Sequence, residues 1–334
     1  FALYKLHISA TTGEALGEPV VIKDTGLAYI QRRLTISADG KKLAYSAQTL
    51  NGNLMSLPVS PKSGEAEGPP TPLAQSTSYR KGTPMFSHDG RKIAFAEFRG
   101  GEQPRIWVMD QDGGNATQLT DGAAIEWAPN WFPDNDTIAF QSDREGKQRV
   151  WSVSVTTGRR NLLLDPGQPI GWPRLSPDGK QIAFNSTKSG TINVWTVPVE
   201  GGAPRQLTFD KDTMGWPCWS PDGKLLALQV KRGGETNIGI MPSTGGEITQ
   251  LTFDHGQSQL HDWSPDGDKI VFAGERGGVW NIYWVSRSTK QVKQLTYYTT
   301  KNHYVRYPAW SPLGNQIVYE YTETTDNIWL MELK

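Results

Sequence analysis

Short apolar segments separated by turn-forming residues run along almost the whole chain, and no stretch shows sustained helical periodicity. A first segment ends in an aromatic residue such as Trp219, and the turn sequence Ser220-Pro-Asp-Gly223 follows it. Proline presets φ, aspartate bonds its own backbone and glycine accepts a positive φ, so this sequence predicts a tight turn. A second apolar segment, a third rich in tryptophan and a fourth reading Gln-Leu-Thr come next. The pattern predicts units of four short strands.

The turn sequence recurs, complete or degenerate, seven times. Its copies begin at Ser37, Ser87, Phe132, Ser176, Ser220, Ser264 and Ser311, at spacings of 44 to 50 residues. This period is typical of the four-stranded blades of a β-propeller. We therefore predict an all-β protein, a β-propeller of seven four-stranded blades, with eight blades as the alternative.

The two ends of the chain predict how the ring closes. The last unit has a third strand at Asn327–Leu330 and no fourth, and Pro19–Ile22 precedes the first full unit. We expect this N-terminal strand to complete the last blade and remove its exposed edge. Residues 1–334 then form one domain, with closing strands in 1–29 and seven repeats in 30–334. Leu3–Leu6 also resembles a third strand, which predicts either an extra edge strand or a chain cut from a longer protein.

Tryptophans recur at two fixed positions in the units, and we expect them to pack between neighbouring blades. They are Trp131, Trp219, Trp263 and Trp310 before the turn, and Trp107, Trp151, Trp195 and Trp329 in the third strand.

Composition narrows the function classes. The chain has 34 Lys+Arg and 34 Asp+Glu, which argues against a basic nucleic-acid surface. No apolar run reaches the length of a membrane span. The single cysteine, Cys218, excludes an intramolecular disulfide and a cysteine-based zinc cluster. The chain begins at Phe1, which we interpret as a mature or trimmed N-terminus, and we expect a monomer.

These units resemble the TolB-like propeller repeat. The resemblance rests on Trp219–Lys224, on Ile106–Asp110 followed by Gly113-Gly114 and Gln118–Thr120, and on Phe140–Gly146. It covers roughly residues 30–334 and implies a propeller outside the cytoplasm. Similar repeats occur in bacterial sensors, in propeller halves of peptidases and in polysaccharide lyases, so the resemblance specifies the fold more than the function.

No catalytic motif of a serine hydrolase, P-loop enzyme, dinucleotide-binding enzyme or zinc peptidase is present. Aromatic residues instead recur four or five positions before the turn, where the first strands of a propeller begin. We predict a ligand site at this channel mouth, because aromatic faces suit peptides and sugar rings and arginines suit carboxylates. Its residues are Trp127, Trp172, Trp216, Tyr307, His261, Arg174 and Arg306. The alternative is that these rings fill space between blades.

The leading hypothesis is a non-catalytic module that binds a protein, a peptide or an oligosaccharide and needs no cofactor. In one form of this hypothesis, the chain is the sensor part of a larger bacterial protein. The alternative is a metal-dependent lyase or hydrolase acting on acidic oligosaccharides. It requires His255, His261 and His303 to meet around one metal ion. Scattered surface histidines are the simpler interpretation.

Overall fold

The computed structural model describes residues 2–332 except 7, 8, 10, 13, 15, 25–28, 40, 75–78, 100, 101, 210–212 and 254. These residues form 27 strands and no helix, and so include no helix with the length and apolar character needed to cross a membrane. The strands assemble into antiparallel sheets of four or five strands and one two-stranded sheet.

Five sheets, named A to E, each consist of four consecutive strands. Sheet A contains β6 (Tyr79–Phe86), β7 (Lys92–Arg99), β8 (Arg105–Asp110) and β9 (Thr117–Gln118). Sheet B contains β10 (Glu126–Trp131), β11 (Thr137–Ser142), β12 (Arg149–Ser154) and β13 (Arg160–Leu164). Sheet C contains β14 (Gly171–Leu175), β15 (Gln181–Ser186), β16 (Asn193–Pro198) and β17 (Arg205–Gln206). Sheet D contains β18 (Thr213–Trp219), β19 (Leu225–Arg232), β20 (Glu235–Pro242) and β21 (Thr249–Gln250). Sheet E contains β22 (Gln257–Trp263), β23 (Lys269–Arg276), β24 (Val279–Ser286) and β25 (Val292–Gln294).

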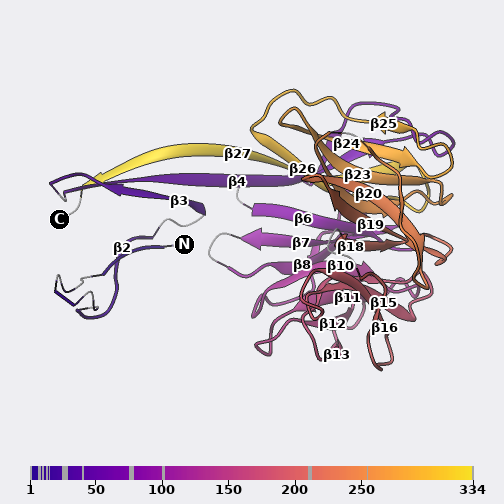
Figure 1. Ribbon diagram of the computed structural model, residues 1–334, viewed down its shortest axis with the longest axis horizontal. Helices are drawn as coiled ribbons and strands as arrows, with labels where there is room; N and C mark the ends of the chain where they lie inside the picture. The colour runs from indigo at the N-terminus through magenta and orange to yellow at the C-terminus, as the bar shows by residue number, and fades with distance from the viewer. Residues whose placement is uncertain are drawn as a thin grey trace.

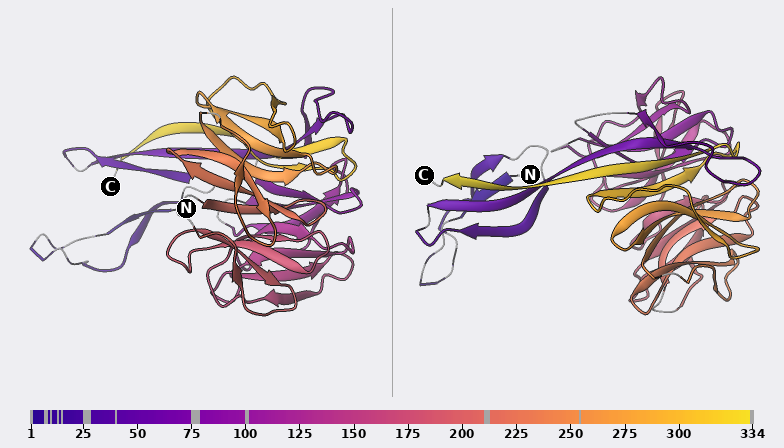
Figure 2. Two further views of the ribbon diagram at one scale, coloured as in Figure 1. Left: turned by 45° about the vertical axis from the view of Figure 1, so that its right-hand side comes forward. Right: turned by 90° about the horizontal axis from the view of Figure 1, so that it is seen from above.

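Sheet F combines the two ends of the chain. Its strand order is β26 (His303–Trp310), β27 (Gln316–Glu332), β4 (Lys42–Pro58) and β3 (Tyr29–Ile36), and β5 (Thr71–Ala74) pairs with β4. Strands β4 and β27 have 17 residues each and pair along their whole length, from Gln316↔Pro58 to Glu332↔Lys42. Figures 1 and 2 show that β3 and the adjoining parts of β4 and β27 project from the other sheets. We call residues 29–36, 42–48 and 326–332 the arm.

The repeated motifs have local structural roles. In the turn of sheet D, Gly223 N donates to Ser220 O (2.8 Å) at φ +70°, and Ser220 Oγ donates to Asp222 Oδ1 (2.7 Å). The buried Thr252 of one Gln-Leu-Thr segment accepts the Ile238 N–H at 2.9 Å, and its equivalents in sheets A, C and E make the same bond. Copies of the repeat therefore build the same kind of turn, and in sheets A, C, D and E they build the same edge contact.

The core lies between sheets. Six clusters of buried apolar residues each join two sheets: A with B, B with C, C with D, D with E, E with F, and F with A. As the sequence predicts, tryptophans before the turn tie neighbours together: the indole N–H groups of Trp131, Trp219 and Trp263 donate to first-strand carbonyls of the preceding sheet at 3.0–3.1 Å.

Two sequence predictions need correction. The strand expected to complete the last unit, β2 (Val20–Asp24), pairs with β1 (Ala2–Lys5) instead. The last unit receives β4 and β5 from the first unit, because β4 matches β27 residue for residue. The described residues therefore form six sheets of four or five strands where the repeats predict seven.

Candidate functional site

The first strand of each sheet contains a bulge shortly before the turn sequence. Where the structure gives the backbone angles there, the residue four positions before the turn has a positive φ of 51–59°. These residues are Thr83, Ala128, Trp172, Trp216 and Tyr307. A bulge redirects the side chains beside it. Along a regular strand, successive side chains point to opposite faces of the sheet. The bulge interrupts this alternation and redirects one side chain in the first strand of each sheet.

Four predicted site residues meet at these bulges. The ring of Trp172 lies 4.7 Å from that of Trp127, 4.6 Å from that of Trp216 and 5.4 Å from that of Tyr307, measured between centroids. The four residues come from sheets B, C, D and F, and each is partly exposed. We call them the aromatic cluster. Since sheets C and F are not neighbours in the cycle of core contacts, the Trp172–Tyr307 contact places the cluster where the sheets converge.

The cluster and the arm lie at the same end of the sheets. The first strands begin near the cluster and run to the turn, and the second strands return. In sheet F the start of β26, His303, pairs with Glu323, and the arm begins three residues further along β27. The arm therefore leaves the sheets on the side of the aromatic cluster.

Polar groups hold the cluster in place. Asn185 Oδ1 accepts the Trp216 N–H at 2.7 Å, and a side chain on Gly215 (φ +82°) would collide with the Asn185 amide. Arg306 hydrogen-bonds the Tyr307 phenol, whose pKa is raised mainly by burial. Within the described residues, the buried Thr83 Oγ1 and Trp127 Nε1 have no hydrogen-bond partner. The cluster thus combines a fixed backbone with polar atoms whose bonding capacity is unused.

Arg174, another predicted site residue, lies closer to the turns than the aromatic cluster does. It lines a cavity of about 330 Å³ at the ends of the first strands, where its Nη1 is 3.6 Å from Met85 Sδ. Asn130, Cys218 and Asp262 line the same cavity from the equivalent position of other sheets. Arg174 follows Trp172 by two residues, which carries it further along the strand towards the turn.

Asp262 contributes a buried carboxyl group to the lining of this cavity, and the sequence did not single it out. Its carboxylate accepts the N–H groups of Trp263 (2.9 Å) and Trp310 (2.8 Å). Burial raises the pKa of Asp262 to about 6, although the charge of Arg174 and these hydrogen bonds act in the opposite direction. Burial also raises the pKa of the neighbouring Cys218 thiol, so Cys218 is protonated at neutral pH.

We expect Asp262 to make stability fall as the pH rises. Its carboxyl binds a proton more tightly in the folded chain than in the unfolded chain, so the free energy of unfolding decreases between about pH 4 and pH 6. The loss should be about 3 kcal/mol. Asp262→Asn should remove this slope in urea unfolding measured at several pH values. Asp222, whose pKa is lowered by its bond to Ser220, titrates below this window, so Asp222→Asn should retain the slope.

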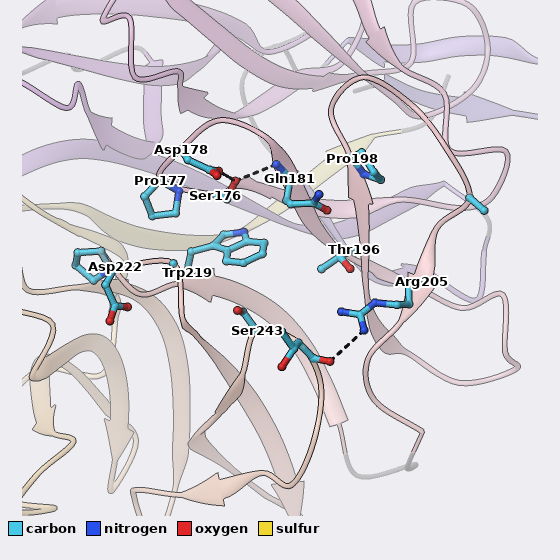
Figure 3. Close-up of a pocket in the computed structure, with 14 residues that line it drawn as sticks. Ser176, Pro177, Asp178, Gln181, Thr196, Pro198, Arg205, Trp219, Asp222 and Ser243 are labelled. Carbon is cyan, nitrogen blue, oxygen red and sulfur yellow. Dashed lines mark hydrogen bonds between the residues drawn. The ribbon is translucent and has the colours of Figure 1, made fainter.

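A groove of about 790 Å³ lies between sheets C and D on the side of the turns (Figure 3). Trp219 forms part of its wall, and Arg205 donates to the Thr244 carbonyl at 3.1 Å. The carboxylates of Asp178 and Asp222 in its lining bond the serines and backbone of their own turns. These acidic groups are therefore already used in building the turns.

The candidate metal ligands do not form a shared site in the described residues. His255 is 97% exposed and contacts Glu235 at 2.7 Å. His303 is buried, and its nitrogens bond Thr300 Oγ1 (2.9 Å) and the Trp280 carbonyl (3.2 Å). The side chain of His261 lies outside the described residues. No three His, Cys, Asp or Glu side chains gather among those that are described. With both nitrogens engaged, His303 serves as a core residue.

Comparisons with known proteins agree with this architecture. The sequence profile of the TolB beta propeller domain matches residues 34–168 and 159–334. The crystal structure of TolB from Acinetobacter baumannii has a TM-score of 0.62 and 21% identity, covering 78% of this chain and 66% of that one. Putative TolB from Agrobacterium tumefaciens has a TM-score of 0.66 and 18% identity, covering 82% of this chain and 99% of that one.

A curated relative matches a shorter stretch. The uncharacterized peptidase YuxL of Bacillus subtilis is 37% identical over 59 residues, which is 18% of this chain. The match spans 9% of that relative's length.

Proposed function

The chain belongs to the TolB β-propeller domain family, and from this premise we propose that it is a binding module. Its ring of sheets presents the aromatic cluster to a segment of a partner protein. The ring in this arrangement has six blades, sheets A to F, and the first and last units complete the sixth together. The six inter-sheet clusters support this count.

The observation that carries the proposal is the backbone at the cluster. The left-handed conformation costs an L-residue with a bulky side chain roughly 1–2 kcal/mol, and glycine would avoid that cost. Trp172, Trp216 and Tyr307 nevertheless occupy such positions, and their rings remain partly exposed. Strain of this kind concentrates at binding and catalytic sites. The rings are therefore better explained by a ligand than by the needs of packing.

The chemistry of the cluster favours a protein ligand. Aromatic residues are enriched and charges depleted at the centres of protein interfaces. The acidic groups near the first-strand starts are already paired, as with Glu320 and Arg80 or Glu126 and Arg144. A sensor role and a location outside the cytoplasm, which the family resemblance implies, remain predictions.

The test uses a displayed library of linear peptides selected against the full chain. Trp172→Gly removes the central ring, and glycine accepts the φ of +51°, so the bulge is kept. Selected peptides should bind this variant about 30-fold more weakly, as expected for an interface hot spot of about 2 kcal/mol. Phe253→Ala, at a 65% exposed outer position, is the matched control and should bind normally.

Peptides that bind both variants equally would refute the aromatic cluster as the site. Binding of oligosaccharides alone, lost in Trp172→Gly, would keep the site and refute the protein ligand.

A further inference from the structure

Strands β4 and β27 are each built from two repeat segments. Residues 42–47 of β4 read as a second strand and Asn53–Pro58 as a third strand, which matches Asn193–Pro198 of β16 in pattern. Likewise residues 316–321 of β27 read as a second strand, and 327–332 matches Asn281–Ser286 of β24. In sheets A to E the corresponding segments are separate strands joined by a turn. In β4 and β27 they form one continuous strand.

The register shows that partners have been exchanged. In sheets A to E an apolar residue of the second strand faces one of the third strand in the same unit. These pairs are Ile93↔Met109, Ile138↔Val153, Ile182↔Val197, Leu226↔Met241 and Ile270↔Val285. In sheet F the equivalent pairs join the first and last units: Ile317↔Leu57 and Leu43↔Met331. Each second strand thus pairs in the ordinary register with the third strand of the other unit.

We propose that the arm is a seventh blade opened by this exchange, and that the chain has a second state in which both hairpins close. Closing pairs Leu43 with Leu57 and Ile317 with Met331, which keeps the register of every other unit. Each unit then contains its own second and third strands, and the arm joins the ring. Because the two states use the same kinds of strand pairs, they differ mainly in their turns and in the packing of the arm. This is a bistable element of the type seen in domain-swapping proteins.

Turn chemistry explains why the open state forms. The connections between second and third strands in sheets A to E all contain glycine: Gly100-Gly101, Gly146, Gly190, Gly233-Gly234 and Gly277-Gly278. The connection in the last unit, Glu323-Thr-Thr-Asp326, contains none, and threonine favours extended strands over tight turns. The first unit retains Asn51-Gly52, a strong turn signal. The second and third strands of the last unit therefore resist folding back into a hairpin. The first unit stays open as well, because its strand β4 remains paired with β27.

The exchange bears on the aromatic cluster. Trp172 and Tyr307 touch across the axis in the six-sheet arrangement, with centroids 5.4 Å apart. Seven sheets of the same width enclose a wider axis than six, so closing the hairpins separates these rings. The arm thereby controls how open the cluster is.

Disulfide trapping in the full chain distinguishes the two states, in a Cys218→Ser background. Ala44→Cys/Leu330→Cys reports the open state, because these residues pair in it. Ala44→Cys/Ser56→Cys reports the closed state. In the open state residues 44 and 56 lie twelve positions apart on one strand, about 40 Å, whereas a disulfide needs Cα atoms within about 7 Å. Ala183→Cys/Thr196→Cys occupies the same register in sheet C and is the positive control.

We expect an intramolecular 44–56 disulfide to form alongside the 44–330 one. Adding Thr324→Asn/Thr325→Gly, which supplies a turn sequence, should increase the 44–56 product several-fold and reduce the 44–330 product. The proposal is overturned if the 44–56 pair stays reduced in both backgrounds while the control pair oxidises. A 44–56 disulfide found only between two chains also overturns it, because the exchange would then belong to a dimer.

Discussion

Replacing Arg80 with alanine is expected to lower the free energy of unfolding by about 3–5 kcal/mol, the cost of leaving a buried charge without its partner. Arg80, in β6, donates its Nε to Glu320 Oε1 at 2.6 Å and its Nη2 to Oε2 at 3.1 Å. Glu320, in β27, is 0% exposed. Thr322 Oγ1 donates to the same carboxylate at 2.8 Å. One hydroxyl cannot replace a bidentate guanidinium, so the carboxylate would remain buried and uncompensated.

Two comparisons isolate this effect in urea unfolding followed by tryptophan fluorescence. Arg80→Met/Glu320→Leu removes both charges and should recover most of the loss, because apolar replacements of a buried pair are often neutral. Lys293→Ala breaks a solvent-exposed pair, Lys293 and Glu65 (2.8 Å), and should cost far less, because water screens exposed ion pairs. An Arg80→Ala cost as small as that of Lys293→Ala would contradict the buried pair.

Leu57→Ala is expected to cost about 2–5 kcal/mol, the range for a buried leucine that leaves a cavity. Leu57 is 0% exposed and packs with Val271 and Trp284 of sheet E, although it belongs to the first unit. Met241 is its equivalent in sheet D, where both paired strands belong to one unit.

Met241→Ala should therefore have a similar cost, measured by the same unfolding experiment. A large loss for Met241→Ala with less than about 1 kcal/mol for Leu57→Ala would mean that β4 does not complete sheet F in solution.

Local sequence was sufficient for sheets A to E, because each of their turns joins strands that are neighbours in the chain. Sheet F could not be predicted in the same way. Leu57 and Met331 both match the register of a third strand, so the apolar pattern alone does not say which one faces Ile317. That choice depends on the turn between the strands and on packing against sheets E and A.

The sequence also predicted that several of the candidate site residues lie close together. The recurring offset grouped Trp172, Trp216 and Tyr307 correctly in space, because the bulge occurs at a fixed distance from the turn. Arg174, two residues after Trp172, lines the cavity near the turns. Asp262 gave no sequence signal, since its raised pKa arises from burial in the folded chain.

The pairing of β4 with β27 also constrains how the protein is made. Gln316 Nε2 donates to Ser56 Oγ at 2.7 Å across 260 residues of sequence. Sheets A to E need only neighbouring strands, so each of them is able to form as it emerges during synthesis. Strand β4 is synthesised before all of them and its partner after all of them. Closing so long a loop is slow, and an unpaired strand edge promotes aggregation. Completion of sheet F is therefore the last step of folding, and the nascent chain is most exposed to misassembly until β27 has left the ribosome.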